Sequence, residues 1–260
     1  MTAREFLSNA AAIVAFMSLL SLVEVAAPLF ARGERSEGRR VANFGLTVLT
    51  FLLNWAMISA AASFAGVLSL QGRGLLPPLA LPTPALIAIS VVTLDFSTYL
   101  AHRSMHETSL LWRVHRIHHS DPFLDVSTTF RQHPFEGLWR FLWVIIPVCV
   151  LGLPIAGLFV YRLLSALQAV CEHANVRLWQ PLDQGLSLVW CTPNMHKVHH
   201  SRAQPQTDSN YGNILTVFDR VFRTFTPTAE AFDVIYGLED VERSYERSLS
   251  GLVTLPFARF

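Results

Sequence analysis

Charged residues are scarce in this chain of 260 residues: 15% are Asp, Glu, Lys or Arg, against about a quarter in soluble proteins. Hydrophobic residues make up 52%, and the mean hydropathy is +0.37. The net charge of +1 gives no indication of nucleic-acid binding. This balance argues against a soluble globular domain and indicates a membrane protein.

Cysteine is also rare. The three cysteines, Cys149, Cys171 and Cys191, show no paired or CxxC spacing, so neither a disulfide framework nor an Fe–S cluster is predicted. The sequence has no Gly-rich dinucleotide fingerprint and no fused cytochrome b5-like domain. Electrons for any redox reaction would therefore come from a separate donor.

The apolar residues are concentrated in four blocks. These are Phe6–Phe30, Val41–Leu70, Pro84–Ala101 and Trp139–Cys171. About 20 apolar residues span the hydrocarbon core of a bilayer, and each of the first three blocks is close to that length or longer. We expect about three transmembrane helices from them.

The first block leaves two possibilities open, a retained helix or a cleaved signal peptide. Small residues follow the stretch LLSLVEVAA, as they do at a cleavage site. However, Arg4 and Glu5 cancel in the preceding segment, and Glu24 and Pro28 lie near the cleavage region. We favour a retained helix.

Loop charges predict the orientation. The connector Arg32–Arg40 carries four arginines against two glutamates, whereas Gln71–Leu75 carries only Arg73. Positively charged connectors stay in the cytoplasm. The third helix then returns inward and brings His102 to the cytoplasmic face.

The fourth block is too long for one span, and LGLP interrupts it at 151–154. We interpret residues 139–171 as a helical hairpin that enters the bilayer and returns. A single long crossing is the alternative, and it would place His173 on the opposite side from His102.

Histidine is absent from the first 101 residues and from the last 60, so all ten histidines lie between positions 102 and 200. Helical residues three or four apart share a face, so each cluster can direct imidazoles at one metal ion or at a close pair. The clusters are HxxxH at His102 and His106, HxxHH at His115, His118 and His119, and HxxHH at His196, His199 and His200, with His133 and His173 single.

This gathering of imidazoles predicts a metal site. Charged imidazoles would repel one another, and binding to a first-row metal keeps them neutral. The pattern is not the metalloprotease HExxH, because position 110 is leucine. Structural zinc prefers four ligands, often cysteine. An all-histidine dinuclear site beside membrane helices instead suits iron that handles O2.

The third helix supports this interpretation. Asp95 and Tyr99 precede His102 and His106 with spacings that place all four on one side of a helix. An ionisable residue near the end of a spanning helix is costly and is by default functional. We expect Asp95 to accept a hydrogen bond from a histidine ring and so to fix its tautomer.

Six stretches resemble the fatty acid hydroxylase / sterol desaturase superfamily, from about Asp95 to Phe225 and in the family's order. They are DFSTYLAHRSMH, LWRVHRIHHSD, RQHPFE, EHAN, TPNMHKVHHS and DSNYGN. The resemblance implies a membrane-bound oxygenase with two non-haem iron ions, O2, an external electron donor and a lipid substrate such as a fatty acyl chain, a sterol or an alkyl ether. It also implies a few membrane helices capped by a cytosolic helical domain.

Through this resemblance, the eight histidines of the three clusters match metal ligands. His173 in EHAN matches a further ligand position, although Asn175 stands where some members have a second histidine. We include His133 as a tenth ligand. Zinc can replace iron in purified protein, because it binds similar ligands more tightly.

Other polar and aromatic residues are weaker candidates. Tyr99, Asp121 and Glu136, like Asp95, could orient histidines. Asn210 and Tyr211 could line the mouth of the site, and a plain capping or loop role is as plausible for each of these residues. Four tryptophans, Trp112, Trp139, Trp143 and Trp190, fit an interfacial aromatic belt better than a cofactor site.

Together these features predict an all-α integral membrane protein in one structural unit. Residues 1–101 supply transmembrane helices, 102–228 the histidine domain with its hairpin, and 229–260 an amphipathic tail. In the tail, an apolar stripe of Val241, Tyr245, Leu249 and Leu252 predicts a helix. It could lie at the membrane interface and guide lipid, or pack on the domain for stability.

The predicted reaction is O2-dependent hydroxylation or desaturation of a lipid C–H bond. A metal-dependent lipid hydrolase and a metal-ion transporter or zinc-binding membrane protein are the alternatives. A transporter normally holds its ligands near the bilayer midplane, often in repeated halves, whereas these histidines follow the membrane segments and no repeat is visible.

Overall fold

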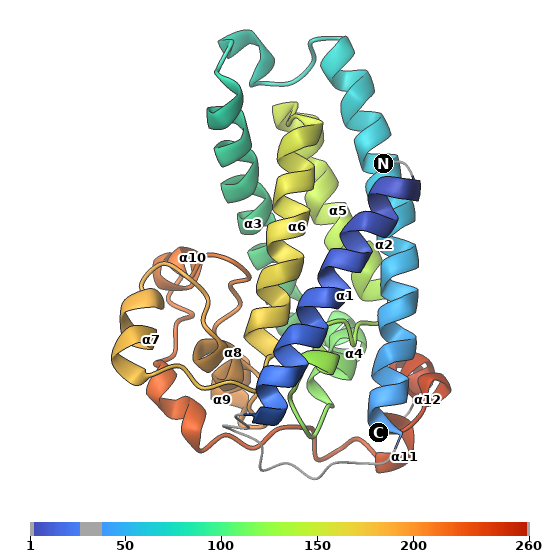
Figure 1. Ribbon diagram of the computed structural model, residues 1–260, viewed down its shortest axis with the longest axis vertical. Helices are drawn as coiled ribbons and strands as arrows, with labels where there is room; N and C mark the ends of the chain where they lie inside the picture. The colour runs from blue at the N-terminus through green and yellow to red at the C-terminus, as the bar shows by residue number, and fades with distance from the viewer. Residues whose placement is uncertain (1–2, 27–37, 259–260) are drawn as a thin grey trace.

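The computed structural model describes residues 3–26 and 38–258. Their regular structure is helical, apart from one isolated bridge between Trp190 and Leu215. Five helices are long and apolar enough to cross a membrane, which confirms the predicted all-α membrane class. They stand side by side in Figure 1 and are α1 (Ala3–Ala26), α2 (Arg39–Leu70), α3 (Thr83–Glu107), α5 (Pro134–Leu151) and α6 (Ile155–His173).

The remaining helices are short and gather at one end of the bundle, except for η1 (Pro77–Leu79) in the α2–α3 connector (Figure 1). The α-helices among them are α4 (Ser109–His119), α7 (Gln180–Leu186), α8 (Pro193–His199), α9 (Gln204–Thr207), α10 (Val217–Val221), α11 (Arg243–Glu246) and α12 (Leu249–Thr254). The single 3-10 turns are η2 (Val126–Thr128), η3 (Thr228–Phe232) and η4 (Leu255–Phe257).

Helix α3 packs against both α5 and α6, and α2 packs against α5. Buried apolar residues of these four helices form one core. Its most buried members are at most 1% exposed and include Leu94 of α3, Val148 of α5, and Leu158 and Tyr161 of α6. It holds in place the helices that carry His102, His106 and His173.

The predicted hairpin is confirmed as two helices, α5 and α6. Gly152 ends α5 in the left-handed conformation, with φ of 67°, and Pro154 precedes the first turn of α6. Gly74 lies so close that a Cβ there would be 2.5 Å from the backbone of Gly152. Leu75 N–H donates to the carbonyl of Val150 at 3.2 Å. The α2–α3 connector therefore covers the hairpin turn, and α6 returns His173 to the end of the bundle where His102 lies.

The start of α2 is fixed at that same end by a buried ion pair. Arg39 is 2% exposed and pairs with Asp121 at 2.9 Å and with Asp125. Asn43 Nδ2 donates to Asp121 at 2.9 Å. The expectation that Asp121 orients a histidine was therefore wrong: its carboxylate anchors α2 to the loop after α4. Residues 32–37 of the basic connector lie outside the described residues.

Helix α1 packs apolar side chains against Val126 and Ala174 near the histidine end, and it also contacts this end through a carboxylate. Glu24 Oε1 accepts hydrogen bonds from the backbone N–H of Val126 at 2.9 Å and of Asn175 at 2.6 Å. These two peptides lie near η2 and just beyond α6, so α1 satisfies backbone donors in two other segments. This arrangement favours a retained helix over a cleaved signal peptide.

The tail does not form the one helix that its apolar stripe predicted. It folds as α11, α12 and η4, and Ser248 interrupts the stripe as the N-cap of α12 by accepting from Gly251 N–H. Leu252 is nevertheless fully buried with Leu46 of α2 and Ile117 of α4. Packing on the domain is the role that these contacts favour.

The hairpin of α5 and α6 predicts that residues 110 and 184 lie on one side of the membrane and residue 75 on the other. We expect single cysteines replacing the exposed Leu110 and Gln184 to react with a membrane-impermeant maleimide from the cytoplasmic side. A cysteine at Leu75, which is 64% exposed, should react only from the opposite side. The measurement uses a background that lacks Cys149, Cys171 and Cys191. Labelling of 110 and 184 from opposite sides would contradict the hairpin.

Candidate metal centre

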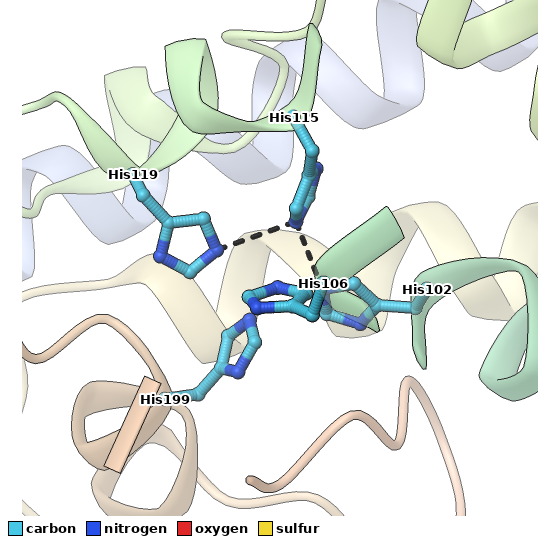
Figure 2. Close-up of side chains that lie close together, drawn as sticks. All are labelled: His102, His106, His115, His119 and His199. Carbon is cyan, nitrogen blue, oxygen red and sulfur yellow. Dashed lines mark hydrogen bonds between the residues drawn. The ribbon is translucent and has the colours of Figure 1, made fainter. Parts of the chain in front are cut away.

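Nine of the ten histidines converge in two groups. Within each group, the candidate ligand atoms lie within 4.8 Å of one another, and every side chain is buried. The first group, shown in Figure 2, has five members: His102, His106, His115, His119 and His199. The second group has four: His118, His173, His196 and His200. We call these the five-histidine group and the four-histidine group.

The two HxxHH clusters are each divided between the groups. On α4, His115 and His119 belong to the five-histidine group and His118 to the four-histidine group. At α8 the division is reversed, with His199 in the larger group and His196 and His200 in the smaller. The groups are adjacent, because the rings of His119 and His200 stack with centroids 4.6 Å apart. In each cluster, the two histidines that are four residues apart belong to one group, and the third histidine belongs to the other.

The nitrogen positions fit metal ions. In the four-histidine group, His173 Nε2 lies 3.0 Å from His118 Nε2 and 3.1 Å from His196 Nε2. In the five-histidine group, His115 Nε2 lies 3.1 Å from His102 Nε2 and 3.3 Å from His119 Nε2. Two imidazole nitrogens bound to one ion, each about 2.1 Å from it, are about 3.0 to 3.4 Å apart. The Nε2 atoms of His106 and His199 are buried without a hydrogen-bond partner, as expected of ligand atoms.

The other ring nitrogen of several histidines is held from outside the groups. His115 Nδ1 lies 3.0 Å from Glu136, and His106 Nδ1 lies 3.3 Å from Asp208. Three more histidines donate a hydrogen bond from Nδ1 to a backbone carbonyl. His102 donates to Tyr211, His199 to Ser209 and His173 to Ala169. Such partners put the proton on Nδ1 and leave the Nε2 lone pair for a metal.

Burial keeps the imidazoles neutral. It lowers the pKa of His115, His118 and His119 on α4 well below the usual range, and the neighbouring histidines lower it further. The same two causes lower the pKa of His196, His199 and His200. A neutral imidazole has a free lone pair, so these side chains are ready to bind a metal ion at neutral pH.

Comparison with known proteins agrees with this geometry. The family model described as "Fatty acid hydroxylase" matches residues 87–224, more than half of the chain. The chain belongs to the fatty acid hydroxylase family. All nine histidines of the two groups lie within the matched segment.

The chain is similar to an ornithine lipid hydroxylase of Rhizobium tropici, with 34% identity over 54% of this chain and 41% of the relative's own length. An alkylglycerol monooxygenase of Danio rerio is 34% identical over 58% of this chain and 32% of its own length. The corresponding protein of Caenorhabditis elegans is 32% identical over 59% of this chain and 29% of its own. The chain thus spans less than half the length of these relatives. No solved structure matches it.

His133 does not join the other nine histidines. Its Nδ1 accepts from the backbone N–H of Phe135 as the N-cap of α5, and its Nε2 lies 3.2 Å from the carbonyl of Val253. Both ring nitrogens are therefore engaged in fixing the start of α5 to the tail. We leave His133 out of the proposed ligand set.

Asp95 contacts a loop and not a histidine. Its carboxylate accepts from the backbone N–H of Ile214 at 3.1 Å and of Leu215 at 2.9 Å, and from Asn213 Nδ2 at 3.3 Å. The expectation of a direct hydrogen bond to a histidine ring was wrong. Asp95 instead holds the segment that follows Tyr211, whose carbonyl contacts His102.

The remaining polar candidates divide between the site and its support. The Tyr211 ring lies 5.1 Å from the His106 ring, so it borders the five-histidine group. Tyr99 lies behind Tyr211, with ring centroids 6.2 Å apart, and its hydroxyl is 3.0 Å from Thr224 Oγ1. Asn210 adopts a left-handed backbone, and its side chain bonds the backbone of Met195 and Thr226. Glu136 contacts a histidine, as the sequence suggested.

Two residues at the site were missed by sequence reasoning. Trp112 was assigned to an interfacial belt, but its ring lies 5.0 Å from the His106 ring and 5.4 Å from the His119 ring. Its spacing of three and seven residues from His115 and His119 on α4 was the available signal. Asp208 contacts His106 from across the chain, and only its place in the DSNYGN stretch drew attention to that region.

The Glu136 contact predicts a measurable effect on metal retention. Replacing Glu136 with alanine removes the acceptor that orients His115, so we expect metal affinity to fall about 10- to 100-fold. Metal content after dialysis against graded chelator measures this. Glu107→Ala is the matched control, because Glu107 also pairs with an arginine four residues away on a helix but is exposed. Equal retention in both variants would contradict the orienting role.

Proposed function

We propose that this protein is a membrane-bound oxygenase that uses O2 and external electrons to hydroxylate a C–H bond of a lipid. The observation that carries the proposal is the pair of adjacent, buried, all-histidine groups at one end of an apolar helical bundle. Membership of the fatty acid hydroxylase family supports it. The relatives are named as a hydroxylase and a monooxygenase, which favours hydroxylation over desaturation.

Each histidine group would hold one iron ion. Imidazole is a good ligand for iron, and both groups supply enough nitrogen donors at suitable separations. Bound iron would supply the reduction of O2 and the oxidation of the C–H bond. Zinc could occupy the same ligands in purified protein.

The chain's own contribution is to hold these ligands rigidly and to exclude water. Glu136, Asp208 and three backbone carbonyls fix the ring orientations. Trp112 and Tyr211 cover the five-histidine group. Exclusion of water protects reactive chemistry from side reactions, and a lipid in the bilayer can approach between apolar helices.

Electrons would come from a separate reductase, ferredoxin or cytochrome b5-like protein. The three cysteines are widely separated and no histidine lies outside positions 102–200, so this sequence offers no separate ligand set for a haem or an Fe–S cluster. The basic connector before α2 favours a metal centre on the cytoplasmic side, and such donors are found in the cytoplasm.

The position of the ligands disfavours a metal-ion transporter. A transporter binds its ion near the middle of the membrane, whereas α4 and α8 lie at one end of the bundle (Figure 1). A lipid hydrolase would turn over without O2, so consumption of O2 with a reductant distinguishes it from an oxygenase.

The two groups predict two transition-metal ions per chain in folded, detergent-purified protein. We expect His115→Ala and His173→Ala each to lower the content to one ion or fewer, because each removes a ligand from one group. His133→Ala should retain two ions. Elemental analysis measures this, and a wild-type content of one ion or none would contradict the two-ion proposal.

The proposed reaction predicts incorporation of oxygen from O2 into lipid. Membranes containing the protein, incubated with ¹⁸O2 and a reductant, should accumulate a lipid carrying one ¹⁸O atom. A variant with alanine at both His115 and His173 should give none, because both groups are broken. A product that carries a new double bond and no ¹⁸O would indicate desaturation, and a product formed without O2 would indicate hydrolysis.

A further inference from the structure

A cavity of about 160 Å³ lies inside the helical bundle. Its walls come mainly from α1, α2, α5 and α6, which are side by side in Figure 1. Much of the wall is aromatic, as in a site for an alkyl chain. The aromatic lining residues are Phe6, Phe51, Trp55, Phe130, Phe141 and Phe159.

Two arginines, Arg140 of α5 and Arg162 of α6, line the same cavity. Arg162 is 11 residues before His173 and so about 16 Å from it along the helix, near the middle of a candidate span. A charge at that depth is costly, and such residues usually mark a substrate or ion path. Two arginines in one cavity therefore need a compensating anion.

The protein supplies a counterion for only one of them. Arg140 Nε donates to Glu136 at 3.0 Å. No Asp or Glu is among the described residues that line the cavity, and no ion pair joins Arg162 to a carboxylate in the described part of the chain. Arg140 also acts on Arg162 electrostatically, as a repulsive like charge. The cavity thus carries an uncompensated positive charge.

Residues that line the cavity are connected by hydrogen bonds to both histidine groups. Arg140 contacts Glu136, which contacts His115 of the five-histidine group. Ala169 lines the cavity, and its carbonyl accepts from His173 of the four-histidine group. A molecule in the cavity is therefore separated from His115 by two residues, Arg140 and Glu136, and from His173 by one, Ala169.

From these observations we infer that the cavity binds an amphipathic lipid through an anionic group, a carboxylate or a phosphate, which pairs with Arg162. The alkyl part packs against the aromatic wall. Asn54 and Asn213 also line the cavity and offer amide donors to the remaining oxygens of the anion. This inference names the substrate class and rests on the proposed oxygenase function.

Binding of three sixteen-carbon probes tests the inference. Radiolabelled hexadecanoate, hexadecyl phosphate and hexadecanol are bound separately to the full-length, metal-loaded protein in detergent. A charged hydrogen-bonded pair with arginine predicts that at least one anionic probe binds about 10- to 100-fold more tightly than the alcohol. Preference for the carboxylate indicates a fatty acid, and preference for the phosphate indicates a phospholipid headgroup. Equal affinity for all three probes overturns the inference.

Substitution of the arginine gives the second arm. Arg162→Gln should lower the affinity for the anionic probes to that for the alcohol, and the affinity for the alcohol should not change. Arg162→Lys should keep a preference for the anion. Arg73→Gln, which removes an arginine from the α2–α3 connector, is the control and should bind as wild type. An equal loss for all probes in Arg162→Gln would mean that Arg162 only supports the fold, and would overturn the inference. If the glutamine variant does not fold, the wild-type comparison still decides.

The binding test is independent of turnover. Selective binding of an anionic probe without ¹⁸O incorporation into any lipid would leave the inference standing and refute the proposed function. Incorporation of ¹⁸O with no preference for an anion would refute the inference alone.

Discussion

The convergence of nine neutral imidazoles is the constraint on which the rest of the structure depends. Each imidazole is polar, so its burial is costly unless both ring nitrogens find partners. Five Nδ1 atoms are satisfied by Glu136, Asp208 or a backbone carbonyl. Within each group the Nε2 atoms point at one another, an arrangement that one metal ion per group would satisfy. Helices α3, α4, α6 and α8 must all be placed to within a fraction of an ångström for this to hold.

Placement is achieved at both ends of the bundle by different means. At the histidine end, the buried pairing of Arg39 with Asp121 and the carboxylate of Glu24 tie α2 and α1 to the loops around the site. At the far end, the close approach of Gly74 to Gly152 locks the connector onto the hairpin turn. The apolar core between them contributes the bulk of the burial, and the polar contacts decide which helix ends meet.

Sequence reasoning predicted the features that local patterns determine. Block lengths indicated the spans, LGLP indicated the hairpin, and HxxxH and HxxHH indicated shared helical faces. It failed where the outcome depends on residues far apart in the chain, as for Asp95, and where a local helix cap was not recognised, as for His133 and Ser248. Asp95 lies on the same side of its helix as His102, but the segment at 213–215 offers it nearer donors. His133 is one residue before Pro134, and that position makes it a helix cap rather than a ligand. The tail stripe was read as one helix because spacing alone does not show that Ser248 starts a new one.

The assignment of each HxxHH cluster to both groups has a thermodynamic consequence for metal loading. Helix α4 cannot rotate to adjust His115 and His119 without also moving His118, and α8 couples His196 to His199 in the same way. If each group holds one ion, the first ion to bind sets the rotation of both helices and so pays the ordering entropy for the second. Loading is then positively cooperative, and chains with a single ion are a minor population at equilibrium.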